Sequence, residues 1–291
     1  MFDLRYHVAS LAAVFLALII GILVGVGLSG SGVTKEADLK VAREQRDNAR
    51  SLADSRLKQL NELGRNANNY ESAFDLAYPE VMSGLLAGKR IGVLFIGSED
   101  SGVNQAIDRT LSDAGAPPAT RVMSLSVPVD AKGLDGALAG KGPQFARYLG
   151  DDELDQLGEA LGAEFQSGGP TPLWKLLGHN LIGQTSGNTR QPLDAIVVVR
   201  TVNLQQGDTA RFLRGLYTGL ASTGAPAVGV EESGRTPSAA PVYRDRGLSS
   251  VDDIDLGTGR VALALLLAGA RSGRYGTADG VDAILPTLPG G

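Results

Sequence analysis

The stretch LSSVDDIDLGTGR, residues 248–260, places three carboxylates close together, at Asp252, Asp253 and Asp255. Carboxylate oxygens are the ligands that hard cations such as Ca²⁺ and Mg²⁺ prefer. Carboxylates that precede a helix can instead accept hydrogen bonds from its first amides and meet the positive end of its dipole. Because an apolar helix is expected to follow, we interpret this stretch as a helix entry in which Thr258 is the N-cap.

A second set of polar residues follows the expected strands, at the sheet edge where α/β proteins bind ligands. This set comprises Glu99, Asp100, Asn203, Glu231 and Glu232. An acidic rim of this kind could hold a hard cation. Loops at strand ends are also solvated, and an acidic chain places carboxylates there, so we favour the interpretation as ordinary surface loops.

Several kinds of chemistry are excluded by residue type. The chain has no cysteine, and therefore no disulfide, thiolate metal site or cysteine nucleophile. A Ser-His-Asp triad would depend on His179, since the other histidine is His7 in the N-terminal segment. The loop after the first strand reads GSEDSG, which is not a dinucleotide fingerprint, and no phosphate-binding GxxxxGK[ST] occurs. We therefore expect no enzyme, no catalytic residue, no cofactor and no metal site.

Strands and helices alternate in the second half of the chain. Apolar runs predict strands at 89–97, 119–127, 194–200 and 225–232, and helices at 103–114, 151–164, 172–184, 208–223 and 259–270. Asp208 is the expected N-cap of its helix, Trp174 is expected in the core, and 131–143 and 166–172 are expected surface loops. The alternation indicates an α/β domain over 88–277, Rossmann-like with a mainly parallel sheet, and an irregular tail over 278–291.

The N-terminus carries an apolar segment. After a short segment of residues 1–7, the run VASLAAVFLALIIGILVGVGL at 8–28 is uncharged, and as a helix it spans roughly 30 Å, the thickness of a bilayer core. A cleaved signal peptide is the alternative, but its apolar region runs to only ~7–15 residues. We expect a retained transmembrane helix. Arg5 and the amino terminus favour a soluble part outside the cytoplasm.

Small residues recur at every fourth position of this segment, and they lie on one helical face. They are Ala9, Ala13, Ala17, Gly21, Gly25 and Ser29. Because small residues let two backbones approach closely in lipid, we expect chains to pair through this stripe, with Gly21 and Gly25 as its GxxxG core.

A heptad pattern follows over residues 34–75. Positions a and d are Leu39, Ala42, Arg46, Ala49, Ala53, Arg56, Leu60, Leu63, Ala67, Tyr70 and Phe74. All but the two arginines are apolar, and charged residues flank them, which is typical of a coiled coil. A single amphipathic helix lying on the following domain is the alternative. We favour self-association, because pairing in the membrane would raise the effective concentration of the seam.

Two motifs at opposite ends of the chain carry a resemblance. LRYHVASLAAVFLALIIGILVG, followed by a coiled coil, resembles the actinobacterial copper transport protein B (MctB) family. LSSVDDIDLGTGRVALALLL, with GRYGT at 273–277, is similar to the C-terminal motif of that family. The resemblance implies a membrane protein of the cell envelope, by family an outer-membrane component, with a role in copper transport or homeostasis.

Two functional classes therefore remain. One is a copper transport protein. The other is a non-catalytic coiled-coil scaffold that regulates cell-wall or septum machinery through a protein partner. In both cases we expect Asp252, Asp253 and Asp255 to be structural, because carboxylates alone do not select copper and no Cys, Met or His lies within twenty residues. With a net charge of −5 and no basic run, nucleic acid is not an expected partner.

Overall fold

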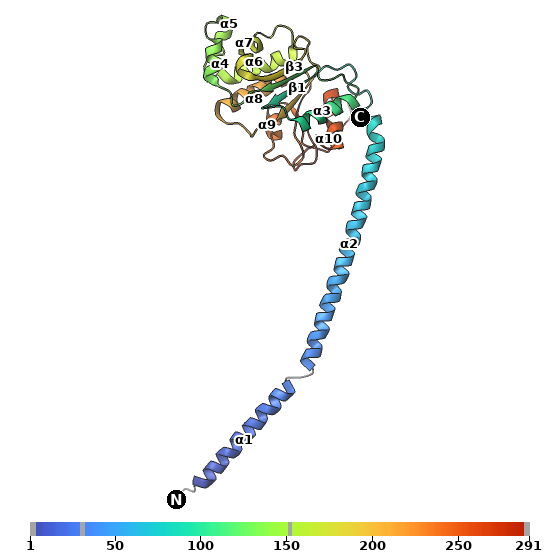
Figure 1. Ribbon diagram of the computed structural model, residues 1–291, viewed down its shortest axis with the longest axis vertical. Coiled ribbons are helices and arrows are strands. Elements are labelled where there is room, and N and C mark those ends of the chain that lie inside the picture. The colour runs from blue at the N-terminus through green and yellow to red at the C-terminus, as the bar shows by residue number, and fades with distance from the viewer. Residues whose placement is uncertain (1–3, 30–32, 151–152, 288–291) are drawn as a thin grey trace. The chain divides into compact units, whose positions relative to one another are not determined.

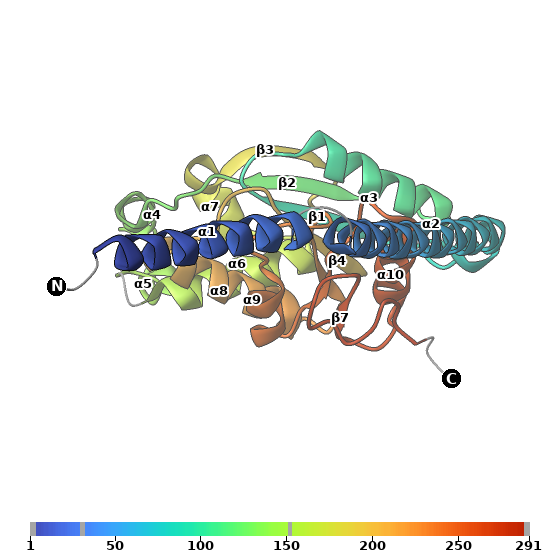
Figure 2. The same ribbon diagram turned by 90° about the horizontal axis from the view of Figure 1, so that it is seen from below.

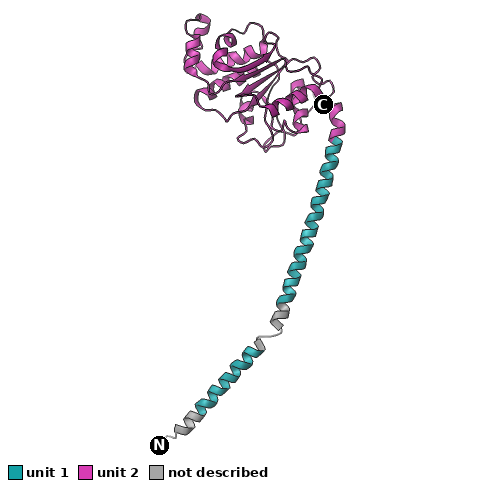
Figure 3. Ribbon diagram, viewed as in Figure 1, with its two compact units in different colours: residues 1–73 teal, residues 74–291 magenta. Residues whose placement is uncertain are grey.

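The computed structural model describes residues 4–29, 33–150 and 153–287, and it describes side chains in 10–27, 38–150 and 153–287. The chain forms two compact units, Met1–Ala73 and Phe74–Gly291 (Figure 3). Parts of the predicted end segments, 1–7 and 278–291, therefore lie outside the described residues, as do the first two residues of the helix expected at 151–164.

The first unit consists of helices. Helix α1 spans Leu4–Ser29, and α2 begins at Val33 and continues through Pro79 to Met82. Apolar side chains of α2 at heptad positions are exposed, among them Leu60 and Leu63. These exposed side chains are available for a contact, and the pairing of α2 with a second chain stays a prediction.

The second unit begins with the last turns of α2 and contains the mixed α/β fold. Its strands are β1 (Ile91–Ile96), β2 (Arg121–Leu125), β3 (Ile182–Gly187), β4 (Ala195–Arg200), β5 (Ala227–Val230), β6 (Ser249–Val251) and β7 (Arg274–Tyr275). Its further helices are α3 (Ser101–Asp113), α4 (Ala131–Leu138), α5 (Pro143–Ala146), α6 (Leu154–Ser167), α7 (Pro172–Leu181), α8 (Gly207–Ser222), α9 (Ala240–Asp245) and α10 (Gly257–Ala268).

These strands form one sheet in the order β3-β2-β1-β4-β5-β6-β7, in which Figure 1 labels β3 and β1 and Figure 2 also labels β2, β4 and β7. All neighbours are parallel except β2 and β3, so the prediction of a mainly parallel sheet is confirmed. Both faces are covered. Leu94 and Ile96 of β1 point into a core with α4 and α6–α9, whereas Val93 and Phe95 point into a core with α3 and α10. This explains why the central strands read as unbroken apolar runs.

Helices α6 and α8 lie side by side (Figure 1 and Figure 2) and approach unusually closely. Gly158 and Gly162 of α6 face Gly215 and Gly219 of α8, at the same four-residue spacing. A Cβ atom on Gly215 would lie 1.9 Å from the Asp155 carbonyl oxygen, and one on Gly162 would lie 2.4 Å from the Leu216 carbonyl oxygen. Backbone therefore packs on backbone at this crossing.

Two expectations about elements are wrong. Residues 131–143, expected as a surface loop, contain α4, because Leu134 and Leu138 are one turn apart and both are buried in the core. The helix expected at 172–184 ends at Leu181, and β3 follows as an antiparallel edge strand. Its residues IGQTSG are mostly exposed and polar, so no apolar alternation announces it.

Both expected N-caps are also wrong. Helix α8 is preceded by Gln206, and Asp208 lies in its first turn, where its carboxylate pairs with Arg211 at 3.1 Å. Helix α10 is preceded by Leu256, and neither helix receives a side-chain cap hydrogen bond. Thr258 lies inside α10 and donates its hydroxyl to Asp253. Trp174, by contrast, is in the core as predicted.

Candidate functional site

The aspartate loop, residues 252–256, connects the carboxyl end of β6 to the start of α10. It is not the set of helix caps that we expected. In the described part of the chain, none of its carboxylates accepts a hydrogen bond from the first backbone amides of α10. Each carboxylate instead contacts a different segment of the second unit.

Asp252 holds the segment after β7. Its Oδ1 accepts hydrogen bonds from the amides of Thr277 at 2.9 Å and Ala278 at 3.2 Å. The chain passes so close that a Cβ atom on Gly276 would lie 2.1 Å from this oxygen, and the φ of Gly276 is +132°. The second glycine of the GRYGT motif, Gly276, and the first aspartate of the loop thus form one contact, which joins the two motifs in the structure.

Asp253 is fully buried. Its Oδ2 accepts a hydrogen bond from the Thr258 hydroxyl at 3.0 Å, but its Oδ1 has no partner among the described residues. Burial, reinforced by the negative charges of Asp252 and Asp255, raises the pKa of this carboxyl to about 6, although the Thr258 hydrogen bond acts in the opposite direction.

Asp255 is exposed and holds the loop after β5. Its two oxygens accept hydrogen bonds from the Ser233 amide at 2.7 Å and the Ser233 hydroxyl at 2.6 Å. Partial burial opposes ionisation, but the Ser233 hydrogen bonds outweigh it and hold the pKa of Asp255 below its usual value. Two carboxyls two residues apart therefore differ in the direction of their pKa shift.

Two carboxylates of the acidic rim lie near each other, since a Cβ atom on Gly102 would be 3.4 Å from Asp100 Oδ1 and 3.7 Å from Glu232 Oε1, but the rim as a whole does not gather at one point. Asp100 caps α3 by accepting hydrogen bonds from the amides of Gly102 and Val103. Glu231 is buried in an ion pair with Arg200 at 2.9 Å. No group of three His, Cys, Asp or Glu side chains that could hold a metal ion is found in the described part of the chain.

Residue types that favour copper are scattered. Met82 and Met123 are buried in the core, in the two clusters on opposite faces of the sheet. His179 is exposed in the last turn of α7. Met1 and the side chain of His7 lie outside the described residues.

Sequence reasoning missed Arg200, whose side chain is only 3% exposed. The sequences at the ends of two adjacent strands could have revealed this residue. Val199 of β4 pairs with Val230 of β5, so the next residues along, Arg200 and Glu231, leave the sheet side by side. A basic and an acidic residue that each end an apolar strand predict an ion pair at that edge.

In the first unit, Gly21 and Gly25 lie on α1, and a Cβ atom on either would meet nothing within 4 Å. The window Ser10–Gly27 is long and apolar enough to cross a membrane, and α1 is the one helix of the described chain that meets this criterion. The small-residue face is thus open for a contact.

Comparison with known proteins covers both units. The model of a family described as copper transport outer membrane protein, MctB, matches residues 1–286. This chain belongs to the MctB family. Proteins named copper transporter MctB from Mycobacterium tuberculosis (strain H37Rv) and Mycobacterium bovis are 25% identical to it over 318 residues, covering 98% of this chain and 99% of each relative. The resemblance drawn from the two motifs is confirmed over the whole length of this MctB-family chain.

Proposed function

We propose that this chain is a membrane-anchored copper transport protein of the cell envelope. The observation that carries the proposal is the family match, which spans the apolar helix, the long helix and the α/β unit together. The relatives whose name states copper transport align over the same full length. The match favours this role over a scaffold of cell-wall or septum machinery.

The proposed arrangement has α1 retained as a single transmembrane helix and the α/β unit outside the cytoplasm. The uncharged window Ser10–Gly27 and the position of Arg5 before it support this topology. The family description adds an outer-membrane location. A periplasm-only reporter fused after Gly291 should be active and remain with the membrane fraction.

We further propose that two chains associate through α1 and through the heptads of α2, residues 34–75. The exposed apolar side chains along α2 support pairing, since a polar solvent-facing helix would not need them. Phe74, the last predicted a/d position, is an exception within these heptads, because its ring packs in the second unit, against Tyr78 and close to Gly257. For the α/β unit we propose a Rossmann-like fold, supported by strand order and parallel pairing.

In this proposal copper is cargo, and the aspartate loop is structural. Every carboxylate of the loop already accepts hydrogen bonds within the unit, and oxygen ligands alone do not select copper.

The test of the copper role is a deletion strain grown at a fixed external copper concentration. Cell copper, measured by mass spectrometry, should differ from that of the parent, and the full-length chain should restore it. A chain lacking residues 10–27 should fail to restore it. Zinc in the same samples is the control and should not change. Unchanged copper in the deletion strain would contradict the proposed function.

A further inference from the structure

A cavity of about 180 Å³ lies at the carboxyl ends of β1 and β4, between the loop after β4 and helices α8 and α9. Its walls are mostly apolar. They include Ile96, Val202, Leu204, Leu213, Tyr217 and Val242. For comparison, a dry apolar cavity of about 150 Å³ holds a molecule of benzene.

The position of this cavity in the sheet is one where α/β folds bind ligands. Chain order reverses between β1 and β4, because β2 and β3 extend the sheet on one side and β5–β7 on the other. A crevice opens at such a reversal, outside the carboxyl ends of the strands. Ile96 and Arg200 are the last residues of the two strands, and both line the cavity.

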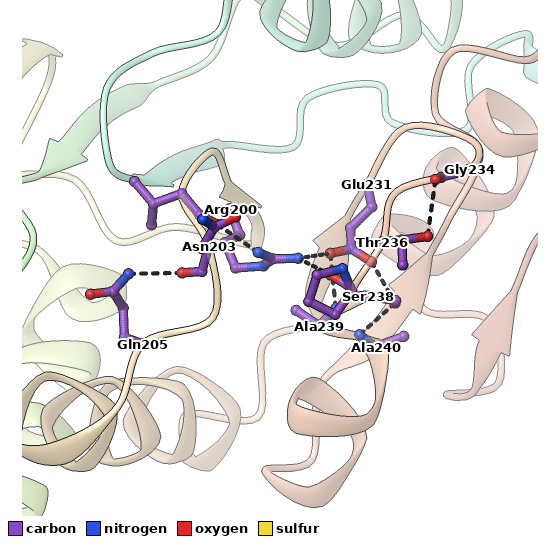
Figure 4. Close-up of polar contacts among 11 residues, drawn as sticks. Arg200, Asn203, Gln205, Glu231, Gly234, Thr236, Ser238, Ala239 and Ala240 are labelled. Carbon is purple, nitrogen blue, oxygen red and sulfur yellow. Dashed lines mark hydrogen bonds and ion pairs between the residues drawn. The ribbon is translucent and has the colours of Figure 1, made fainter.

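Arg200 is the buried polar group of the cavity wall. It donates hydrogen bonds to the carbonyl oxygens of Val202 and Pro237 and to Glu231 Oε1 at 2.9 Å (Figure 4). Glu231 in turn accepts from the Ser238 hydroxyl and the Ala239 amide. These bonds fix the guanidinium in place against the cavity.

These bonds use three of the five N–H donors of the guanidinium, and the Nε–H is among the two left over. The Nε–H of Arg200 is buried and has no acceptor among the described residues. A buried donor without an acceptor costs free energy, so this group favours a molecule that offers one. Gln205, also on the wall, uses one N–H of its side-chain amide to donate to the Asn203 carbonyl at 2.8 Å (Figure 4).

The charge of the site selects between neutral and ionic occupants. Glu231 balances the charge of Arg200, and both side chains are only 3% exposed. Arg214 also lines the cavity, but its guanidinium is paired with Asp155 at 3.8 Å and its side chain is 43% exposed to solvent. An anion would therefore lose its hydration in the apolar cavity without meeting a buried, unpaired positive charge there. A neutral molecule with a hydrogen-bond acceptor loses far less.

We propose that this cavity binds a small, neutral and mainly apolar organic molecule whose carbonyl or hydroxyl oxygen accepts a hydrogen bond from Arg200. The inference goes beyond the copper role and does not depend on it. It gives the α/β unit a ligand of its own at the carboxyl edge of the sheet.

Two probes of the same shape test the proposal. Cyclohexanone offers a carbonyl oxygen, and methylenecyclohexane carries a CH₂ group in its place. Each is titrated into the full chain in detergent micelles, with the methyl groups of Leu204, Leu213 and Val242 observed by NMR. Cyclohexanone should shift these signals saturably, and methylenecyclohexane should bind about tenfold more weakly, since it leaves the buried donor unpaired.

Variants that fill the cavity locate the binding. Ala210 lines the cavity from α8 and is only partly buried, so Ala210→Phe should abolish the shifts, whereas Ala210→Ser, which keeps the cavity open, should retain them. Val242→Phe blocks the opposite wall and replaces Ala210→Phe if that variant does not fold. Arg200 itself is left unchanged, because its removal would strand Glu231 as an unpaired buried charge.

The proposal is overturned if neither probe produces saturable shifts, or if both blocking variants bind cyclohexanone as the original chain does. Equal affinity for the two probes would refute the role of Arg200 and with it the proposed class of ligand.

Discussion

Asp253 and Asp255 are two residues apart, yet protonation affects their folded forms in opposite ways. Burial raises the pKa of Asp253 to about 6, so the folded protein binds this proton more tightly than the unfolded chain does. The contribution of Asp253 to stability is therefore lost as the pH rises from about 4 through about 6. Asp255 has a lowered pKa, so its contribution is fully present above the unfolded pKa of about 4 and is lost as the pH falls through the lowered pKa of the folded state.

Neutral amides at these positions should separate the two effects. Asp253→Asn removes the buried charge and can still accept from Thr258, so it should stabilise the protein by about 2 kcal/mol at pH near ~8 and have little effect at pH near ~4.5. Asp255→Asn weakens the hydrogen bonds from Ser233 and should lower the free energy of unfolding by about 1 kcal/mol at the higher pH. Denaturant unfolding at the two pH values measures both. An Asp253→Asn variant that is less stable at the higher pH contradicts this assignment.

The same loop should not bind copper tightly. Calorimetric titration of the full chain with Cu(I) and with Cu(II) is expected to show no stoichiometric site in the loop, because its ligands are carboxylates that are already hydrogen-bonded. Asp253→Asn is the matched variant, and its titration should be the same. A tight site that disappears in Asp253→Asn would make the loop a copper centre instead.

At the scale of elements, the α6–α8 crossing depends on residues without side chains. Gly215→Ala would place a methyl group 1.9 Å from the Asp155 carbonyl oxygen, and backbone cannot move as easily as a side chain. We expect a loss of at least about 2 kcal/mol in the free energy of unfolding. Gly136→Ala is the control, since that helical glycine of α4 has nothing within 4 Å of its Cβ position and should gain up to ~1 kcal/mol.

This comparison is decided by urea unfolding of the two variants beside the unsubstituted chain. Similar stabilities for Gly215→Ala and Gly136→Ala would mean that the helices separate at no cost and that the close approach is not needed. The crossing also positions the wall of the cavity, because Leu213 and Tyr217 lie on α8.

The parts of the fold that sequence predicts well are those with local apolar patterns. Strand β4 reads AIVVVR and is buried along its whole length, and β1 behaves alike, whereas β2 is buried except at the partly exposed Val122. Strand β3 is polar and exposed, and is held by backbone pairing with β2, so no side-chain pattern could reveal it. Strand order also explains how separate motifs meet, since β6 lies beside β7 and brings Asp252 to Thr277.

The aspartate loop shows the corresponding limit for the site. Its local pattern predicted helix capping, but Asp252 and Asp255 bond to residues 25 and 22 positions away. Such partners depend on tertiary packing, which a reading of neighbouring residues does not contain. The ion pair of Arg200 and Glu231 is intermediate in predictability, because the register of two adjacent strands is enough to place these residues together.

At the scale of the whole molecule, two chains would pair through two weak contacts, one along α1 in the membrane and one along α2. The small-residue face of α1 is open at Gly21 and Gly25, and the seam of α2 carries exposed leucines such as Leu60. Each contact is modest alone, but a first contact raises the effective concentration for the second. Disruption of the membrane contact should therefore weaken association along α2 as well.

Replacement of both Gly21 and Gly25 by isoleucine tests this coupling. The added side chains fill open space on α1, so the helix itself should persist, while the closest approach of two backbones becomes impossible. Cross-linking between cysteines introduced at position 60 in native membranes should fall severalfold relative to the unsubstituted chain. As a matched control, isoleucine at Leu23 and Val24, which lie outside the four-residue stripe, should leave the cross-linking yield unchanged. If the glycine double variant cross-links as well as its control, the membrane stripe contributes nothing and any association resides in α2.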